Sequence, residues 1–242
     1  MSDVKCAKGM KTIDFSEFEK QSDITFKDKD LLRQAFTHRS YLNENPHKKL
    51  EHNERLEFLG DAVLELAITE YLFVRFPQKT EGDLTAYRAA LVNTQMLSQA
   101  ASEAGMNDFL LLSKGEARDT GKARQYILAN TFEAVLGAFY MDQGYAPTKQ
   151  FIEKNLFFRL DAILKDGSWQ DAKSHFQEKS QEALGITPSY RMVRETGPDH
   201  DKRFTVGVYL GKDTVAEGEG RSKQEAEQSA ARAAALVKGW DK

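Results

Sequence analysis

The sequence predicts an all-α domain followed by a small α+β domain in the order α-β-β-β-α, and two observations carry this prediction. From Leu31 to about Leu164 the apolar residues recur every three or four positions, which is the period of an amphipathic helix. After the polar stretch KDGSWQDAKS, short segments alternate apolar and polar residues, as half-buried strands do. We therefore expect the all-α domain over residues 1–165, a linker over 166–170 and the α+β domain over 171–242.

The helical domain shows its period most clearly in LLRQAF, LEFLGDAVLELAITEYLF, LTAYRAALVNTQMLSQAA and ILANTFEAVLGAFYMDQG. Its helices are expected to stop at Pro77, at Gly105 and at Gly144 followed by Pro147. Proline lacks the N–H that a helix interior needs, and glycine readily adopts the left-handed backbone conformation with which many helices end.

The second domain is expected to open with a helix over roughly residues 172–183. Strands follow in SYRMVRE, KRFTVGVYLG and DTVAEGEG. The middle strand places its apolar side chains on one face, and these are Phe204, Val206, Val208 and Leu210. The alanine-rich segment SKQEAEQSAARAAALVKG forms the last helix, with Ser222 as its N-cap and Gly239 as its stop.

Composition indicates a soluble globular protein. The chain has 242 residues, of which 40% are hydrophobic and 29% charged, enough for one large domain or two unequal ones. No run approaches the roughly 18 apolar residues that span a bilayer, and the N-terminus is too charged for a secretory signal. We therefore expect a cytoplasmic protein with no membrane partner. The lone Cys6 excludes both a disulfide framework and a cysteine-based zinc site.

The net charge of −3, taken as an average, argues against a nucleic-acid partner. The acidic excess lies wholly upstream of residue 171, however. If those acids bind divalent cations, the net charge of the sequence differs from the charge that a partner meets.

The segment NERLEFLGDAVLEL, residues 53–66, places carboxylates in an otherwise apolar helix. At about 100° per residue, its acids fall within an arc of about 80°, and these are Glu54, Glu57, Asp61 and Glu65. The opposite side carries Leu56, Leu59, Val63 and Leu66, which predicts a two-faced helix. Taken alone, the acidic face is more simply a solvated surface.

Two details favour a site over a solvated face. No lysine relieves the repulsion between like charges three and four residues apart, and Arg55 lies off the acidic arc. Phe58 projects near the acids instead of joining the leucine face, so its ring would be exposed unless a partner subunit covers it. The face therefore predicts a bound cation, and Phe58 predicts a second subunit.

Further acids occur in two other segments. In ILANTFEAVLGAFY, Asn130 and Glu133 share one face of an apolar helix, and a buried glutamate needs a partner or a metal ion. In TEGDLTAYRAALV, Thr80 and Asp83 have capping-box spacing and Glu81 lies in the first turn, so capping and the helix dipole account for these acids. Oxygen ligands without cysteine or paired histidine suit Mg²⁺ or Mn²⁺, and hence metal-dependent hydrolysis of phosphodiesters.

NERLEFLGDAVL resembles the signature of the ribonuclease III family. FTHRSYLNE (36–44), EGDLTAYRAALV (81–92) and ILANTFEAVLGAFYMDQG (127–144) support the resemblance. The segments SYRMVRETGPDHDKRFTVGVYL and GEGRSKQEAEQSAARAAA resemble a double-stranded RNA-binding domain. The match runs from about residue 15 to 240, in the order of a bacterial-type ribonuclease III. The resemblance implies the ribonuclease III endonuclease fold for the first domain.

The resemblance also implies an endonuclease that cleaves double-stranded RNA as a homodimer. Its products would be 5′-phosphate and 3′-hydroxyl ends with short 3′ overhangs, and its substrates ribosomal RNA precursors and other structured transcripts, including messenger RNA. The family pattern assigns the binding of Mg²⁺, or of Mn²⁺ in its place, to Glu57, Asp61 and Glu133. It assigns catalytic roles to Asp61, Glu133, Glu54 and Glu81. Phe58 matches an aromatic residue that enters the partner subunit.

Asn130 departs from the family, whose best-known bacterial members carry an aspartate there as a further metal ligand. An amide oxygen can still coordinate weakly, but the site loses one negative charge. We expect an active enzyme with weaker Mg²⁺ affinity. The alternative is a catalytically weak protein that binds double-stranded RNA on the same scaffold. A metal-dependent hydrolase of small phosphate esters is disfavoured by the second domain.

The second domain is expected to read the A-form shape of duplex RNA across two minor grooves. The resemblance assigns RNA contacts to Gln177 and Glu178 on its first helix, to Pro198 and His200 in the turn GPDH, and to Arg221, Ser222 and Lys223 at the start of its last helix. Gln224, Glu225 and Glu227 thin the usual basic cluster, so phosphate affinity is expected to be modest and strongly salt-dependent.

The remaining histidines of the helices and loops are interpreted as structural or surface groups, and these are His38, His47, His52 and His175. The segment SKGEARDTGKARQ, residues 113–125, fits either a mobile RNA-contacting loop or ordinary solvated loop chemistry.

Overall fold

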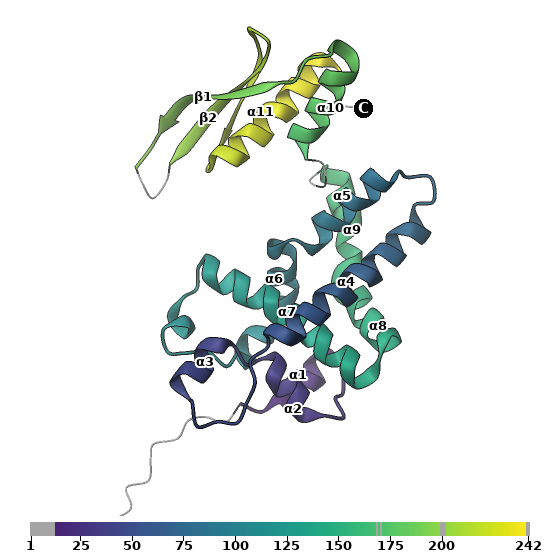
Figure 1. Ribbon diagram of the computed structural model, residues 1–242, viewed down its shortest axis with the longest axis vertical. Coiled ribbons are helices and arrows are strands. Elements are labelled where there is room, and N and C mark those ends of the chain that lie inside the picture. Colours follow the sequence, from purple (N-terminus) through teal and green to yellow (C-terminus); the bar gives the residue numbers. More distant parts are fainter. Residues whose placement is uncertain (1–12, 168, 170, 199–201, 241–242) are drawn as a thin grey trace, which may run out of the picture. The chain divides into compact units, whose positions relative to one another are not determined.

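The computed structural model describes residues 13–167, 169, 171–198 and 202–240, and the chain divides into two compact units between Asp166 and Gly167 (Figure 1). The first unit is helical, and the second combines helices with an antiparallel sheet. The predicted fold class of each domain is therefore confirmed.

The helices of the first unit are α1 (Phe15–Ser22), α2 (Lys29–Ala35), α3 (Arg39–Glu44), α4 (Glu54–Arg75), α5 (Glu81–Val92), α6 (Thr94–Glu103), α7 (Lys122–Gln143), α8 (Tyr145–Leu156) and α9 (Leu160–Asp166). Short 3₁₀ turns cover Met106–Phe109, Glu116–Arg118 and Phe157–Arg159. α9 extends one residue into the predicted linker.

Most of the predicted helix ends are where the sequence places them. α4 ends at Arg75, shortly before Pro77, and α6 ends before Gly105, whose φ is 72°. α7 ends at Gly144, whose φ is 80°. Pro147 instead lies in the first turn of α8, where the missing N–H costs no intrahelical hydrogen bond.

α7 lies at the centre of the first unit, and α2, α4, α6 and α8 pack against it. Its buried side chains point in several directions and include Leu128, Phe132, Val135 and Phe139. A helix that is apolar on all sides is surrounded by its neighbours. A carboxylate on α7 is therefore at least partly covered, and this is the situation of Glu133.

α4 turns a different face to the core from the one that the sequence predicts. Leu56 and Val63 are buried as expected, but Leu66 is 58% exposed. The buried stripe also includes Gly60, Leu64, Ala67 and Ile68. The prediction that the leucines form the core face was therefore partly wrong, because α7 crosses α4 at Gly60 and the core face is centred near that glycine.

The second unit consists of α10 (Ala172–Leu184), β1 (Ser189–Thr196), β2 (Arg203–Leu210), β3 (Asp213–Gly220) and α11 (Lys223–Lys238). The strands pair in the order β1-β2-β3, and β2 buries Val206, Val208 and Leu210 as predicted. α11 packs closely on β3 because Gly218 has no side chain, and a Cβ there would lie 2.0 Å from the Ala230 nitrogen.

Candidate functional site

α4 is anchored at its first turn, where the acidic segment begins. The side chain of Asn53 does not cap the helix, and its Nδ2 donates to the Ala35 carbonyl at 3.2 Å. The backbone N–H of Asn53 donates to the Thr37 carbonyl at 2.9 Å. Because Asn53 is buried, these bonds fix the start of α4 to the end of α2 and so position Glu54 and Glu57.

A contact between two glycines brings the acids of α4 and α7 together. A Cβ on Gly60 would lie 1.8 Å from the Glu133 carbonyl oxygen, and a Cβ on Gly137 would lie 2.1 Å from the Leu56 carbonyl oxygen. Real side chains never approach other atoms this closely. The two backbones can therefore touch only because neither residue has a side chain. This role was not predicted from the sequence, although two glycines inside otherwise bulky apolar helices are a detectable signal.

Glu57, Asp61 and Glu133 form the group that we call the acidic cluster. Burial, followed by the charges of Asp61 and Glu57, raises the pKa of Glu133 to about 8. Burial is also the largest cause that raises the pKa of Glu57, where the charge of Glu54 adds to it. Burial and then the charge of Glu65 raise the pKa of Asp61. The cluster is therefore a place where a cation would relieve both repulsion and desolvation.

Asn130 lies within the reach of this cluster. A hydrogen bond between the Asn130 side chain and Glu57 opposes the effect of burial, so the pKa of Glu57 rises less than it would without this bond. Since a carboxylate oxygen only accepts, the amide NH₂ of Asn130 is the donor in this bond. The residue that departs from the family pattern thus stabilises the charged form of a predicted ligand.

The members of the acidic cluster are neighbours but do not converge on one point. Among the described residues, no three Asp, Glu, His or Cys side chains are grouped closely enough to hold a metal ion. The donor set nevertheless fits a hard cation, because it offers carboxylate oxygens where burial disfavours uncompensated charge. Coordination there requires the side chains to turn toward a common centre.

Glu54 lies one turn before Glu57, beside residues with no predicted role in the site. Arg39 Nη1 donates to Glu54 Oε1 at 3.4 Å, and His52 Nδ1 lies 3.8 Å from Glu54 Oε2. His38 caps α3 by accepting the Ser40 N–H on its Nδ1, which confirms its structural interpretation. Arg39 belongs to no metal-ligand or capping spacing, so the sequence offered no signal for its contact with Glu54.

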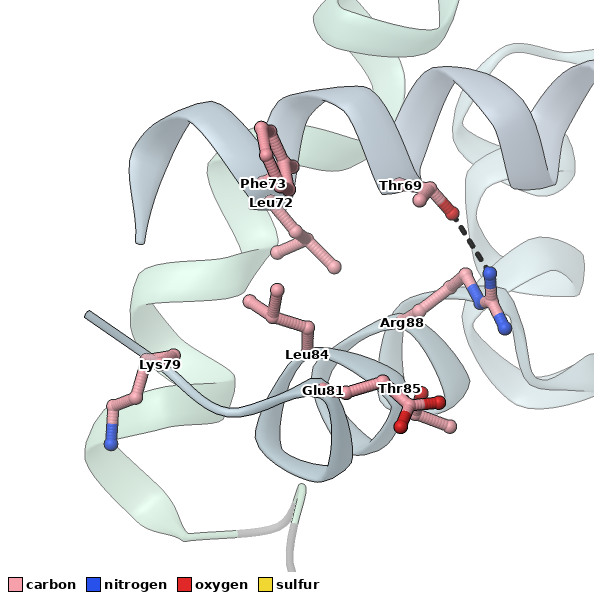
Figure 2. Close-up of a pocket in the computed structure, with 8 residues that line it drawn as sticks. All are labelled: Thr69, Leu72, Phe73, Lys79, Glu81, Leu84, Thr85 and Arg88. Atoms are coloured by element: carbon pink, nitrogen blue, oxygen red, sulfur yellow. Dashed lines mark hydrogen bonds between the residues drawn. The ribbon is translucent and has the colours of Figure 1, made fainter. Parts of the chain in front are cut away.

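Glu81 lies apart from the acidic cluster within one chain. It lines a cleft of about 410 Å³ between α4 and α5, and the other lining residues are Thr69, Leu72, Phe73, Lys79, Leu84, Thr85 and Arg88. Figure 2 shows the residues that line this cleft. Arg88 Nη1 donates to Thr69 Oγ1 at 2.8 Å in this cleft. Glu81 is not among the charges that raise the pKa values in the cluster. The capping box predicted for Thr80 and Asp83 is present.

Phe58 is 81% exposed, so one chain by itself does not cover its ring. It begins a row of exposed residues that we call the α4 stripe, made up of Phe58, Ala62, Leu66, Thr69 and Phe73. At about 100° per residue, these positions fall within an arc of about 80°. Leu66 and Phe73 are 58% and 71% exposed, and three large apolar side chains exposed along one row of a helix are unusual.

The predicted RNA contacts of the second unit lie on its surface. The exposed residues among them are Gln177, Glu178, Pro198, Arg221, Ser222 and Lys223, whereas His200 lies outside the described residues. Ser222 is the N-cap of α11, as predicted. Glu227, one of the acids that thin the basic cluster, pairs with Lys173 of α10 at 2.6 Å between Oε2 and Nζ.

The loop over residues 113–125 is tied to the first unit by hydrogen bonds. The Ser113 N–H donates to Ser40 Oγ at 3.1 Å, and the Lys114 N–H donates to Glu44 Oε1 at 3.2 Å. The Arg124 guanidinium donates to backbone carbonyls within the loop. These bonds favour an ordered structural loop over a mobile one.

Comparisons with known proteins match both units. The family model described as Ribonuclease-III-like matches residues 28–160, and the double-stranded RNA binding motif matches residues 172–237. Ribonuclease 3 of Enterococcus faecalis is 43% identical over 219 residues, which cover 89% of this chain and 94% of the relative. Ribonuclease 3 of Bacillus velezensis is 44% identical over 223 residues, which cover 91% and 88%.

A solved structure supports the same assignment for the first unit. The nuclease domain of ribonuclease III from Campylobacter jejuni matches with a TM-score of 0.53 and 42% identity, covering 59% of this chain and 98% of that domain. No helix in the described parts of the chain is long and apolar enough to cross a membrane. The chain therefore belongs to the ribonuclease III family of double-stranded-RNA endoribonucleases, and it carries the nuclease domain and the RNA-binding motif in one polypeptide.

Proposed function

We propose that this protein is a Mg²⁺-dependent endoribonuclease that cuts double-stranded RNA to 5′-phosphate and 3′-hydroxyl ends with short 3′ overhangs. The observation that supports this most directly is the acidic cluster, in which burial and neighbouring carboxylates raise the pKa of Glu133 to about 8. Its substrates would be precursors of ribosomal RNA and other structured transcripts, including messenger RNA, in the cytoplasm.

Glu57, Asp61 and Glu133 would hold Mg²⁺, or Mn²⁺ in its place, and Asn130 would contribute at most a weak amide oxygen. When bound, the ion lowers the pKa of an attacking water and stabilises charge that develops on the phosphate. The protein positions the ligands, because the contact between Gly60 and Gly137 holds Glu133 of α7 close to the carboxylates of α4. Glu54, oriented by Arg39, would contribute at the rim of the same site.

The proposed reaction is tested with a long RNA duplex incubated in Mg²⁺ and, separately, in chelator. Wild-type protein should shorten the duplex to discrete products with the metal alone. Glu133→Gln should slow cutting by about 100-fold or more, because a ligand for the charge-stabilising ion is lost, while binding in chelator persists. Glu153→Gln is the matched control: its carboxylate is exposed on α8 and is not among the charges that raise the pKa values in the cluster, so we expect cutting close to that of the wild type.

Normal cutting by Glu133→Gln would remove our metal assignment. Binding without cutting by the wild-type protein would support the alternative, a catalytically weak RNA-binding protein on the same scaffold. Asn130 is the residue that favours this alternative, because its amide replaces a charged ligand of the family pattern.

We also propose that Asn130 weakens Mg²⁺ affinity without abolishing activity. Its amide donates to Glu57, so it supports one carboxylate ligand without adding a fourth negative charge. Asn130→Asp should lower the Mg²⁺ concentration at half-maximal cutting, and calorimetric titration of the free protein should show tighter metal binding. Equal half-saturation points for the two proteins would contradict this proposal.

A homodimer through the α4 stripe would cover the exposed ring of Phe58. In a two-fold interface each contact occurs twice. If two α4 helices pack antiparallel and cross at Leu66, the Phe58 end of one helix lies against the Phe73 end of the other. The cleft between α4 and α5 opens at that end, and Leu72, Phe73 and Leu84 line it. We propose that Phe58 enters the corresponding cleft of the partner subunit.

The same arrangement gives Glu81 a place in the site. Glu81 lines the cleft, and Phe58 is adjacent in sequence to Glu57 of the acidic cluster. A ring seated in the cleft therefore brings the acidic cluster of one subunit near Glu81 of the partner subunit. On this proposal Glu81→Gln should impair cutting and leave dimerisation intact, and unimpaired cutting would contradict it.

Sedimentation measures the dimer directly. Phe58→Ala should weaken dimerisation by about 30-fold or more, which is the usual effect of removing a buried aromatic anchor. Val74→Ala is the matched control, because Val74 is 74% exposed on the same helix but lies outside the α4 stripe. An equal effect of the two substitutions would exclude the proposed interface.

A further inference from the structure

The N-terminal end of α11 holds a carboxylate at the place where the family pattern predicts an RNA phosphate. Ser222 Oγ accepts the Glu225 N–H at 3.1 Å. In return, Glu225 Oε2 accepts the Arg221 N–H at 2.8 Å. The Glu225 side chain therefore folds back over the end of the helix to the backbone of Arg221, one of the two predicted cationic contacts.

This end of the helix stabilises one negative charge. The first N–H groups of a helix lack intrahelical acceptors, and the helix dipole is positive there. In the free protein the Glu225 carboxylate supplies the negative charge. A phosphate that approaches Arg221 and Lys223 meets an N–H group that is already engaged, together with a carboxylate of like charge.

The neighbouring acid on α11 is arranged differently. Glu227 is partly buried and pairs with Lys173 at 2.6 Å, so its charge is cancelled within the protein. Glu225 is exposed, and within the described part of the chain no lysine or arginine forms an ion pair with it. Its charge is therefore presented to RNA, whereas that of Glu227 is not.

We propose that Glu225 is an internal competitor of RNA phosphate, which occupies the start of α11 in the free protein and leaves it when RNA binds. This inference rests on the proposed binding of double-stranded RNA. The competitor weakens each RNA-binding domain, so tight binding requires a duplex long enough to engage both RNA-binding domains of a dimer. Glu225 thereby disfavours short duplexes as substrates.

Glu225→Gln tests the proposal, because the amide oxygen can still accept the Arg221 N–H while the charge is removed. Asp213→Asn is the matched control: it makes the same charge change on an exposed residue at the opposite end of β3. Binding of the full-length protein to a duplex of about 16 base pairs, the span of one such domain, is measured in chelator over a range of salt concentrations. A duplex several times longer is measured in parallel.

At low salt, Glu225→Gln should bind the short duplex about three- to tenfold more tightly than the wild type, as expected for removing one like charge about 5 Å from a phosphate. The gain should shrink as salt rises, and it should be smaller for the long duplex. Asp213→Asn should change affinity less than about twofold, because screening weakens charges more than about 10 Å away.

Unchanged affinity of Glu225→Gln, or an equal gain in Asp213→Asn, would overturn the inference. A lowered melting temperature of Glu225→Gln with unchanged affinity would also overturn it, since Glu225 would then act as a helix cap alone. Failure of the wild-type protein to bind either duplex would refute the proposed function itself, and this result is distinguishable from the others.

Discussion

The nuclease unit and the RNA-binding unit place their acidic side chains in opposite environments, as a comparison of the acidic cluster with the acids at the start of α11 shows. In the cluster, Glu57, Asp61 and Glu133 are partly covered and repel one another, and each has a raised pKa. On α11, Glu225 accepts a backbone N–H and Glu227 pairs with a lysine. The number of acids therefore does not identify a site, whereas charge that the fold buries without compensation does.

The difference arises from where the helices lie. α7 is surrounded by other helices, and the glycine contact with α4 leaves its Glu133 little room to reach solvent. α11 covers one face of a sheet, and its first turn stays in water. Three predictions test this contrast, from the largest expected effect to the smallest.

The first prediction concerns the helix contact that assembles the cluster. Gly60→Ala should lower the free energy of unfolding by about 3 kcal/mol, because the added Cβ would lie 1.8 Å from the Glu133 carbonyl oxygen and the helices must separate. Gly82→Ala is the matched control in α5, where the nearest atom to an added Cβ is 3.8 Å away, and it should change stability by less than about 1 kcal/mol. Denaturant unfolding measures both, and equal stabilities of the two variants would refute the close contact.

The second prediction concerns the pH dependence of the metal-free protein. The pKa of Glu133 is raised from 4.5 to about 8, so between these values the native state holds a proton that the unfolded chain has released. The stability contributed by this proton is complete below pH 4.5 and is lost as pH rises through about 8.

Glu133→Gln removes this titration. In chelator, its free energy of unfolding should decline less between pH 5 and pH 8 than that of the wild type, as urea unfolding at several pH values would show. Glu153→Gln provides the control, because its carboxylate is exposed on α8 and is not among the charges that raise the pKa of Glu133. Parallel pH curves for wild type and Glu133→Gln would show that Glu133 titrates normally.

The third prediction concerns the compensated acid of the RNA-binding unit. Glu227→Gln should cost about 0.5 kcal/mol or less, because the ion pair with Lys173 is partly exposed and such pairs contribute little. Thermal unfolding of the full chain measures the loss. A cost of about 3 kcal/mol or more, as expected when a buried ion pair loses one partner, would contradict this prediction.

Much of the fold was predictable because its signals are local. The caps at Thr80 and Ser222 and the stop at Gly239 depend on side chains and backbone within a few residues, and all are present. Val206, Val208 and Leu210 of β2 are buried as alternation predicts, although Thr205 between them is buried as well. The apolar face of α4 was only partly predicted, because Leu66 is exposed and Gly60 is buried.

The candidate site was predictable in its residue types but not in its arrangement. Helical spacing placed Glu57 and Asp61 on one face, and they do lie together. It could not show that Glu81 lines a separate cleft, or that Arg39 contacts Glu54. These relations join segments that are distant in sequence, and no local pattern reports them.

The sequence by itself determined the two fold classes, most element ends and the residues from which a metal site can be built, because period, capping and charge spacing are properties of short segments. The tertiary structure alone decided which carboxylates are uncompensated. That outcome depends on which helix is central and on two glycines that let α4 and α7 touch. Burial and distance between segments set the pKa of a carboxylate, and neither is a property of its own segment.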